Sequence, residues 1–358
     1  MIYSLCSGGA EKIVVDLSNE LALMGHEVIL LMLLSEENNK YLFNKQFLDS
    51  KVKFCSLNFT RGFSLSKVKK VENFILKENP DIVHCHLNVI PYIFRLALIN
   101  KKIRFFHTLH NVAEATCGSY IQSKINRLFY KRSIIHPVCI SSLCLESYIS
   151  FYKLHNASYV NNGRAIVKPT KLLNDVRQEI EGYKQDNDTI VFIHVARCDR
   201  QKNQKLLIEA FNRLDKSSLD FVLLIIGNGF DSEMGEQLKL TACSKIFFLG
   251  EKINVTDYLL SSDAFCLSSH YEGLPISLLE AISCGITPIC TAVGGIPNVI
   301  ADGKYGYLAK DQNVETYVEA VMRFVKQPLD KNTLIEYFMN NFSIKKCASE
   351  YVEIYRKN

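Results

Sequence analysis

Two glutamates, Glu272 and Glu280, stand eight residues apart in the stretch SSHYEGLPISLLEAISCG, and both could bind a hydroxylated ligand. Pro275 is a favoured first residue of a helix and Gly285 a typical residue after a helix end, so the spacing predicts a helix between them. Glu272 then lies in the preceding loop, whereas Glu280 lies inside the helix among apolar neighbours. A buried carboxylate needs hydrogen bonds, and ligand hydroxyls are suitable donors. A structural role for Glu280, capping a neighbouring loop, remains the alternative.

The start of the same predicted helix could bind an anion. Backbone N–H groups at Gly273 and Leu274, and those that follow Pro275, have no partner within the helix and carry the positive end of its dipole. A negatively charged ligand is therefore expected there.

A pair of cations follows an earlier apolar strand, in the sequence VARCDRQKN. Arg197 ends the strand and Lys202 opens the next helical region, so the two side chains can converge on one anion. The planar fork of arginine and the point charge of lysine together suit a diphosphate. Arg200 could compete for this role, or simply be solvated.

The motif CSGGAEK lies near the start of the chain. Gly8 and Gly9 before a helix let the backbone approach a phosphate closely. Neither this motif nor GNG at 227–229 is the G-x-G-x-x-G fingerprint, which argues against a dinucleotide oxidoreductase. No G-x-x-x-x-G-K-[ST] motif occurs, which excludes a P-loop kinase.

Four histidines end two neighbouring predicted strands. His84 and His86 alternate and therefore point to the same side, while His107 and His110 end the next strand. Four imidazoles could in principle bind a metal, but no carboxylate or cysteine spacing completes a recognised ligand set. His110 lies beyond its strand, where it could reach into a cleft.

Strand-like and helix-like segments alternate along both halves of the chain, which predicts right-handed βαβ units and a doubly wound α/β sheet in each half. Typical helical patterns cover 11–24, closed by Gly25, and 203–214. Two such sheets joined by a linker leave a cleft at the carboxyl ends of their strands, where ligands bind. The strands are expected at 28–34, 52–55, 82–85, 103–107, 134–140, 158–160, 190–196, 221–226, 246–249, 264–267, 287–290 and 305–308.

The polar segment 164–188 is the expected boundary between the two halves. It is charged and contains Pro169 and Gly182. It also contains Asp186-Asn187-Asp188, a D-x-D sequence that binds metal and diphosphate in some sugar transferases. Because Asp and Asn are ordinary turn residues, we interpret this sequence as a turn.

Composition excludes several classes of protein. Apolar residues make up 48% of the 358 residues and charged residues 22%, as in a soluble globular protein. The apolar run 28–34 is far shorter than the roughly 20 residues that span a bilayer, and no signal-peptide pattern precedes it. None of the twelve cysteines forms a C-x-x-C pair, so free thiols in a reducing cytosol are expected. Six of the cysteines lie in apolar runs: Cys55, Cys85, Cys139, Cys198, Cys266 and Cys290.

The positive charge is concentrated in the first half. Residues 1–165 contain 20 basic and 12 acidic residues, and the rest contains 22 and 25. Lys124, Arg127 and Lys131 share one face of a predicted helix. This asymmetry favours an anionic partner such as a membrane surface, although a solvated helix face is an equal alternative. Nucleic acid is disfavoured because no binding motif accompanies the charge.

Taken together, these motifs resemble the family-4 retaining glycosyltransferases of the GT-B fold, over nearly the whole chain. The most specific match is the E-x7-E pattern from Glu272 to Glu280, followed by GGIPNVI. Three further features match the family: the Arg197 and Lys202 pair, the glycine loop GGAE that begins with Gly8, and an interdomain turn at Asn162-Gly163.

The resemblance implies two Rossmann-like domains around a cleft. Residues 1–165 would bind the acceptor, residues 166–341 would bind the donor, and a helix within 342–358 would pack back on the first domain. Site roles follow from the same match: Arg197 and Lys202 on the diphosphate, Glu280 on the ribose, Glu272 with Gly273, Leu274 and Pro275 on the donor sugar and phosphate, Gly8 and Gly9 on the donor, His110 near the reacting sugar, and Lys252 and Ile253 on the base.

The implied reaction transfers a sugar from a UDP- or GDP-sugar to a glycan or lipid-linked acceptor, with retention and without a metal or other cofactor. The enzyme is expected in the cytoplasm, peripherally on the inner face of the membrane, and in cell-surface polysaccharide, lipopolysaccharide or capsule synthesis. Two alternatives stay open: a GT-B nucleotide-sugar epimerase, and a non-catalytic nucleotide-sugar-binding partner of another transferase.

The chain departs from the family at its start, where only Ile2 to Cys6 precede the glycine loop. A complete first strand is central in this fold, so a shortened one is expected to leave ladder groups exposed. Either the chain begins upstream of Met1 or the protein is marginally stable. A C-terminal amphipathic helix is expected at 344–356.

Overall fold

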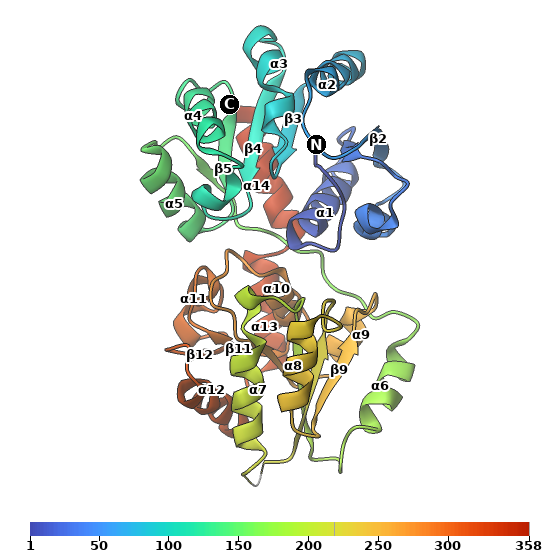
Figure 1. The fold of residues 1–358 in the computed structure, drawn as a ribbon, viewed down its shortest axis with the longest axis vertical. Helices are drawn as coiled ribbons and strands as arrows, with labels where there is room; N and C mark the ends of the chain where they lie inside the picture. The colour runs from blue at the N-terminus through green and yellow to red at the C-terminus, as the bar shows by residue number, and fades with distance from the viewer. Residues whose placement is uncertain (218, 358) are drawn as a thin grey trace. The chain divides into compact units, whose positions relative to one another are not determined.

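The computed structural model describes residues 1–217 and 219–357, which divide into two compact units. Unit 1 contains Met1–Ala165 and the C-terminal segment that begins at Phe342, and unit 2 contains Ile166–Asn341. Both units are α/β (Figure 1). Each is described in turn below.

Unit 1 alternates short parallel strands with helices. Its strands pair only in parallel, in the orders β1-β2 and β3-β4-β5-β6. Mainly apolar runs such as ILLMLL in β1 form such strands because both sheet faces are covered. The elements are α1 (Gly9–Leu23), β1 (Ile29–Leu34), η1 (Asn39–Phe47), β2 (Lys53–Phe59), α2 (Leu65–Glu78), β3 (Ile82–His86), η2 (Ile90–Tyr92), α3 (Phe94–Ile99), β4 (Arg104–Leu109), η3 (Ala113–Thr116), α4 (Tyr120–Lys131), β5 (His136–Cys139), α5 (Ser142–Tyr152), β6 (Ser158–Tyr159) and α14 (Ile344–Lys357).

The first three residues connect the two sheets of unit 1. The Met1 ammonium donates to the His84 carbonyl, 2.6 Å away, and the Met1 carbonyl accepts from the His86 N–H. On the other side, Ile2 bridges Met32 of β1 in parallel. The short N-terminal segment therefore lies between β1 and β3 and satisfies ladder groups of both strands. Burial lowers the pKa of the Met1 ammonium.

Helix α14 is part of the core of unit 1. Tyr351 and Tyr355 pack in one apolar cluster with Leu17 of α1 and Phe106 of β4. Beside this cluster, the buried Arg164 guanidinium pairs with the Asp16 carboxylate of α1. The segment that leaves unit 1 toward unit 2 is therefore fixed to α1.

Unit 2 contains one six-stranded parallel sheet, in the order β12-β11-β10-β7-β8-β9. The run Phe221–Ile226 in β8 is entirely buried, as expected of an inner strand. The elements are α6 (Leu173–Glu181), β7 (Ile190–Val195), η4 (Arg200–Lys202), α7 (Gln204–Leu214), β8 (Phe221–Ile226), α8 (Glu233–Thr241), β9 (Ile246–Gly250), α9 (Val255–Leu260), β10 (Ala264–Leu267), α10 (Ile276–Ser283), β11 (Thr287–Thr291), α11 (Ile296–Val299), η5 (Ala301–Gly303), β12 (Tyr307–Ala309), α12 (Val314–Lys326) and α13 (Lys331–Asn341).

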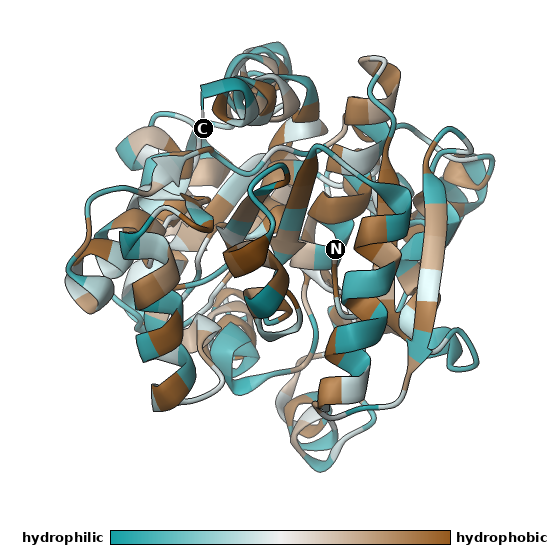
Figure 2. Ribbon diagram, turned by 90° about the horizontal axis from the view of Figure 1, so that it is seen from above, coloured by the Kyte–Doolittle hydropathy of each residue, from teal (hydrophilic) through white to brown (hydrophobic). Residues whose placement is uncertain are grey.

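Amphipathic helices cover the sheets, and the brown and teal faces of individual helices are visible in Figure 2. In α7 the predicted apolar stripe is buried, from Leu206 and Leu207 to Leu214, and packs in one cluster with Phe221 of β8 and Tyr317 of α12. Nothing in the described helices is both long and apolar enough to cross a bilayer.

All twelve predicted strands are present, with errors at their ends. Strand β2 continues to Phe59, beyond the expected 52–55. The prediction stopped short because the continuation, SLNF, alternates polar and apolar residues and is not a continuous apolar run. Strand β5 is shorter than the expected 134–140. The segment around Asp186 is a turn, in which the Asp186 carboxylate accepts from the Asp188 N–H, as predicted.

The cysteines are free thiols throughout the chain. Of the six placed in apolar runs, four are buried, while Cys55 and Cys198 are only half-buried. Burial raises the pKa of Cys85 and Cys266 to about 12. These two thiols therefore act as small apolar side chains.

Candidate active site

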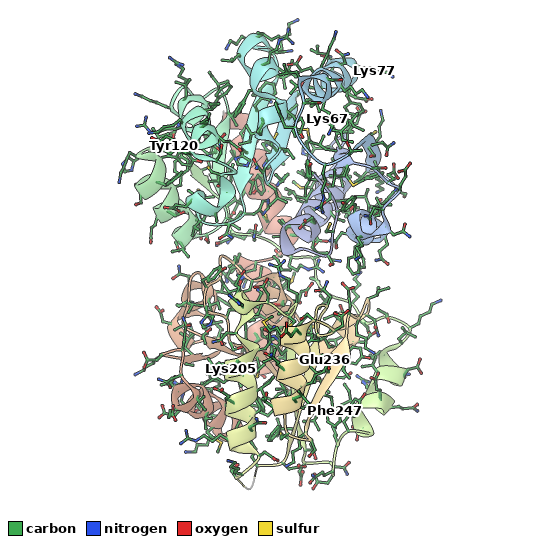
Figure 3. The ribbon with its side chains drawn as sticks, viewed as in Figure 1. Lys67, Lys77, Tyr120, Lys205, Glu236 and Phe247 are labelled. Carbon is green, nitrogen blue, oxygen red and sulfur yellow. The ribbon has the colours of Figure 1, made fainter. Side chains whose placement is uncertain are left out.

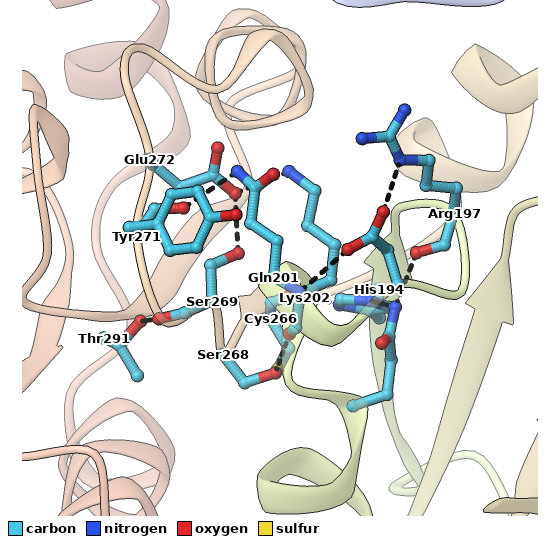
Figure 4. Close-up of polar contacts among 12 residues, drawn as sticks. His194, Arg197, Gln201, Lys202, Cys266, Ser268, Ser269, Tyr271, Glu272 and Thr291 are labelled. Atoms are coloured by element: carbon cyan, nitrogen blue, oxygen red, sulfur yellow. Dashed lines mark hydrogen bonds and ion pairs between the residues drawn. The ribbon is translucent and has the colours of Figure 1, made fainter. Parts of the chain in front are cut away.

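The candidate site lies where two neighbouring strands of unit 2 end. Strands β7 and β10 pair in parallel, with Ala264 opposite Phe192. Parallel neighbours end at the same sheet edge, where α/β proteins bind ligands. The loop after β7 carries Arg197 and Lys202, and the loop after β10 carries Glu272 (Figure 4).

The loop after β7 is a tight turn that keeps its two cations close to the strand end. Asp199 caps the short helix η4 by accepting from the Gln201 N–H, and its other carboxylate oxygen lies 3.2 Å from Nε of Arg197. The buried Gln204 amide donates to the Arg197 carbonyl at 2.8 Å. Arg197 is 62% exposed, so its guanidinium faces solvent while its backbone is held.

Lys202 is held differently, through a buried carboxylate. Its Nζ lies 2.5 Å from Oε1 of Glu272, and the Ser269 hydroxyl donates to the same oxygen at 2.6 Å. The Glu272 side chain is only 6% exposed. A carboxylate at this depth requires such charged and hydrogen-bonded partners, so Lys202 and Glu272 stabilise each other.

Backbone contacts join the two loops. The Ser268 hydroxyl lies 3.0 Å from the carbonyls of both Lys202 and Asn203. The Gln201 carbonyl accepts from the His270 N–H, and the Gln201 amide donates to the Tyr271 carbonyl. These contacts hold the Lys202–Glu272 pair in place (Figure 4).

Two glycines, Gly294 and Gly295, pack directly against the backbone of the Glu272 loop. A Cβ on Gly294 would lie 1.8 Å from the Glu272 carbonyl oxygen, and one on Gly295 would lie 2.2 Å from that of Gly273. The Gly295 N–H donates to the Gly273 carbonyl. Only glycine permits this approach, which explains GGIP after β11.

Helix α10 begins one residue later than predicted. Pro275 is its N-cap, with extended backbone, rather than its first helical residue, and the helix begins at Ile276. Gly285 follows its end with φ of +73°, as predicted. Leu274 and Pro275 are buried, Gly273 is half-buried, and Glu280 is half-buried on the helix.

The end of β9 and the loop after β7 both contact Gly227, which follows β8. The Gly227 N–H donates to the Gly250 carbonyl, and a Cβ on Gly227 would lie 2.0 Å from the Ala196 carbonyl oxygen. Beyond this point Lys252 Nζ lies 3.9 Å from Glu179, whereas Ile253 is 65% exposed. An exposed apolar side chain at this sheet edge can cover a planar ligand.

The remaining predicted site residues lie in unit 1. Helix α1 begins at Gly9 with Gly8 as its N-cap, and a Cβ on Gly8 would lie 2.2 Å from a carboxylate oxygen of Glu11. His110 follows β4 directly, and its Nε2 lies 3.0 Å from Nδ1 of His86. Burial lowers the pKa of His110 to about 3.

The other two histidines are fully engaged by protein groups. His84 bonds the Tyr355 hydroxyl and the Thr108 hydroxyl, and His107 bonds the Tyr130 hydroxyl and the Leu87 carbonyl. Burial lowers the pKa of His107 to about 4 and that of His84 well below its ordinary value. Within 1–217 and 219–357, no group of three or more His, Cys, Asp or Glu side chains is arranged to hold a metal ion.

Several site residues escaped the sequence analysis. Asp199 and Ser269 bond the predicted Arg197 and Glu272, but a short polar residue in a loop carries no motif of its own. Gln204 was hidden in the first turn of a helix. Of these site residues, Gly294 could have been identified from the sequence, because paired glycines after a buried strand indicate a close approach of two backbone segments.

Comparison with known proteins defines the class of this protein. Its fold matches that of Anabaena HepE, solved with UDP and glucose, with a TM-score of 0.78 and 15% identity over 99% of this chain and 97% of that one. Together with this likeness, the two parallel α/β units of the chain define the GT-B fold of glycosyltransferases.

Family models identify the chain more closely. Residues 7–163 match "Glycosyltransferase Family 4", and residues 175–340 match "Glycosyl transferases group 1". The chain belongs to the family-4 glycosyltransferases, as its motifs predicted, and is therefore a transferase enzyme.

Two characterised relatives are similar along most of their length. N-acetyl-alpha-D-glucosaminyl L-malate synthase of Bacillus anthracis is 26% identical over 97% of this chain and 93% of its own. UDP-Gal:alpha-D-GlcNAc-diphosphoundecaprenol alpha-1,3-galactosyltransferase of Escherichia coli is 26% identical over 86% of this chain and 85% of its own.

Proposed function

We propose that this enzyme transfers a sugar from a UDP- or GDP-sugar to a glycan or lipid-linked acceptor in cell-surface polysaccharide synthesis, with retention of the anomeric configuration. The observation that carries this proposal is the Lys202–Glu272 pair beside Arg197 at the ends of β7 and β10. The relatives support the substrate classes, since one has a UDP-sugar donor and a diphosphoundecaprenol acceptor in its name.

In this proposal the donor diphosphate binds to Arg197 and Lys202. Cleavage of the bond between the sugar C1 and the β-phosphate oxygen leaves negative charge on that oxygen while the sugar becomes oxocarbenium-like. The two cations stabilise the leaving phosphate without a divalent ion. The exposed guanidinium can move to a ligand, whereas the ammonium is already positioned by Glu272.

The acceptor oxygen then attacks C1 from the face that the phosphate leaves. The new bond joins this oxygen to C1, and the leaving phosphate oxygen takes the acceptor's proton. Hydrogen bonds from Lys202 and Ser269 to Oε1 draw charge from the Glu272 carboxylate and weaken it as a covalent nucleophile, which favours this route. His110 contacts the reacting sugar, Glu280 binds the ribose hydroxyls, and the 250–253 backbone contacts the base.

Unit 1 supplies the acceptor site and an anionic-membrane contact in this proposal. At the start of α4, Tyr120 (labelled in Figure 3) and Ile121 are 75% and 71% exposed. The ammonium of Lys124 lies over the Tyr120 ring. Exposed apolar side chains beside lysines suit the interface of an anionic leaflet. Arg127 contributes less, because its Nε donates to the Tyr152 carbonyl. The enzyme then works peripherally, on the cytoplasmic face.

The test follows radiolabelled sugar from UDP- and GDP-sugars in the presence of membranes or lipid-linked acceptor. We expect label in a lipid or glycan product with the anomeric configuration of the donor. An inverted linkage would contradict the same-face mechanism. Label found in a changed nucleotide sugar would indicate an epimerase, and binding without turnover would indicate a non-catalytic partner.

A further inference from the structure

Among the residues that the structure describes, the His86 ring makes the side-chain hydrogen bond that holds the ring of His110 at a defined angle. His86 is 4% exposed at the end of β3, and its Nδ1 lies 3.0 Å from Nε2 of His110. The two rings have centroids 5.3 Å apart. Backbone bonding fixes His86 in turn, because its N–H donates to the Met1 carbonyl.

The other ring nitrogen of His110 is available. Its Nδ1 is buried but has no hydrogen-bond partner among the described residues, although the residue as a whole is only partly buried. Buried polar atoms are nearly always paired, so this nitrogen near the surface can take a hydrogen bond from water or from a ligand that replaces it. A sugar oxygen can both donate and accept, and therefore fits either state of this nitrogen.

A neutral imidazole carries one donor and one acceptor nitrogen, so the bond to His86 decides the role of the other nitrogen of His110. When His86 donates to Nε2, His110 keeps its proton on Nδ1 and offers an N–H to the ligand. When His110 donates from Nε2, its Nδ1 offers a lone pair instead. Without His86 the tautomer of His110 is no longer tied to that of a buried neighbour, and the ring loses the bond that holds its angle.

His84 contacts the ring of His86 and has its own hydrogen-bond partners. Its ring centroid lies 4.1 Å from that of His86. Both of its nitrogens are engaged, by Tyr355 of α14 and by Thr108, which in turn bonds the Tyr351 hydroxyl. His84 thus packs against His86 in the same histidine cluster but does not bond His110, which makes it a suitable control.

We propose that His86 is a positioning residue that fixes the tautomer and orientation of His110, so that Nδ1 of His110 meets an oxygen of the bound donor sugar. This inference rests on the proposed function, which places His110 at the reacting sugar. His86 itself does not contact the ligand. Replacing His86 should therefore slow the release of UDP from a UDP-sugar and leave the binding of UDP alone unchanged.

The variants separate positioning from packing. His86→Leu removes the bond to His110, whereas His86→Asn keeps a polar atom near the position of Nδ1. His110→Ala removes the contact to the ligand, and His84→Leu disturbs the same cluster without touching His110. Each full-length variant is measured for UDP release from UDP-glucose, UDP-galactose and UDP-N-acetylglucosamine, and for UDP affinity. Nitrogen-15 spectra of the ligand-free protein report the tautomer of His110.

We expect His86→Leu to mix the tautomers of His110 and to slow UDP release about tenfold, the effect of losing one good hydrogen bond. UDP affinity stays unchanged, because UDP lacks the transferred sugar that His110 contacts, and His86→Asn recovers most of the rate. An unchanged His110 tautomer in His86→Leu, or an equal rate loss in His84→Leu, would overturn the inference and leave the proposed function intact. Normal UDP release by His110→Ala would overturn the role of His110 both in this inference and in the proposed function.

Discussion

The ammonium of Lys202 lies 2.5 Å from the carboxylate of Glu272, although 70 residues separate them in the chain. The contact exists because β7 and β10 are neighbours in the sheet, which brings the loops that follow them to one edge. Both side chains are largely buried, so each loses its solvation and relies on the other. This pair fixes a cation where the proposed diphosphate binds.

Ser269 determines how firmly the pair is held. Ser269→Ala removes the hydrogen bond to Oε1 of Glu272, and we expect donor turnover to fall about tenfold, since a bond to a charged group is worth about 1.5–3 kcal/mol. Initial rates at saturating donor measure this loss. Ser349→Ala, on an exposed part of α14, serves as the control. Equal rates in both variants would show that Ser269 has no positioning role.

Gly294 tests the support beneath the same loop. In Gly294→Ala the new methyl would meet the Glu272 carbonyl oxygen at 1.8 Å, so the Glu272 loop must move. We expect a lower Tm and a loss of UDP binding. Gly303→Ala is the matched control, because Gly303 also has positive φ but nothing within 4 Å of its Cβ position.

Backbone strain alone costs roughly 1–2 kcal/mol, and Gly303→Ala isolates that cost. If both glycine variants lose the same stability and both still bind UDP, the close approach of Gly294 to Glu272 is unimportant. Thermal unfolding and calorimetric titration together decide between these results.

Much of this arrangement could be predicted from the sequence. Arg197 and Lys202 were identified because charged residues after an apolar strand lie at the ligand edge of a parallel sheet. Glu272 was identified because it precedes the helix predicted at Pro275 and stands eight residues before Glu280. The strands were found because buried parallel strands are mainly apolar. Helix ends at Gly25 and Gly285 followed from the left-handed backbone that each requires.

The pairing of the charges could not be predicted. Nothing in the residue order indicates that Lys202 bonds Glu272 while Arg197 bonds Asp199, because these contacts depend on strand order and loop conformation. The polar half of β2 was missed for a related reason, since a half-buried edge segment lacks the continuous apolar run of an inner strand.

The buried histidines predict a strong dependence of stability on pH. Burial lowers the pKa of His84, His86, His107, His110 and His194, the last to about 4. Below pH 6.5 the unfolded chain binds protons that the folded protein excludes, so stability is complete above that pH and declines as pH falls toward 4. Each group contributes about 1.4 kcal/mol per pH unit.

Urea unfolding at about pH 7 and about pH 5.5 measures this effect. We expect the free energy of unfolding to fall by about 3 kcal/mol or more, from several histidines acting together. A free energy that stays constant over this range would mean that the four clustered imidazoles of unit 1, and His194 in unit 2, take up protons in the folded protein as they do in the unfolded chain.

The exposed start of α4 predicts membrane binding. Replacing Tyr120 and Ile121 by serine removes two large apolar side chains, and we expect weaker co-sedimentation with vesicles that contain phosphatidylglycerol. Pure phosphatidylcholine vesicles should bind poorly in every case. Leu240→Ser, at a position 85% exposed on unit 2, is the matched control. Loss of binding in this control alone would place the membrane contact on unit 2 instead.

Calorimetric titration of UDP, GDP and ADP into the EDTA-treated enzyme and its Lys202→Ala variant tests the central claim most directly. Lys205→Ala, three residues along and 78% exposed, is the control. We predict that one nucleoside diphosphate binds the wild-type and Lys205→Ala proteins without a metal ion, and that Lys202→Ala reduces this affinity at least about tenfold. Binding that requires a divalent cation, or that survives in Lys202→Ala at full strength, would contradict the account.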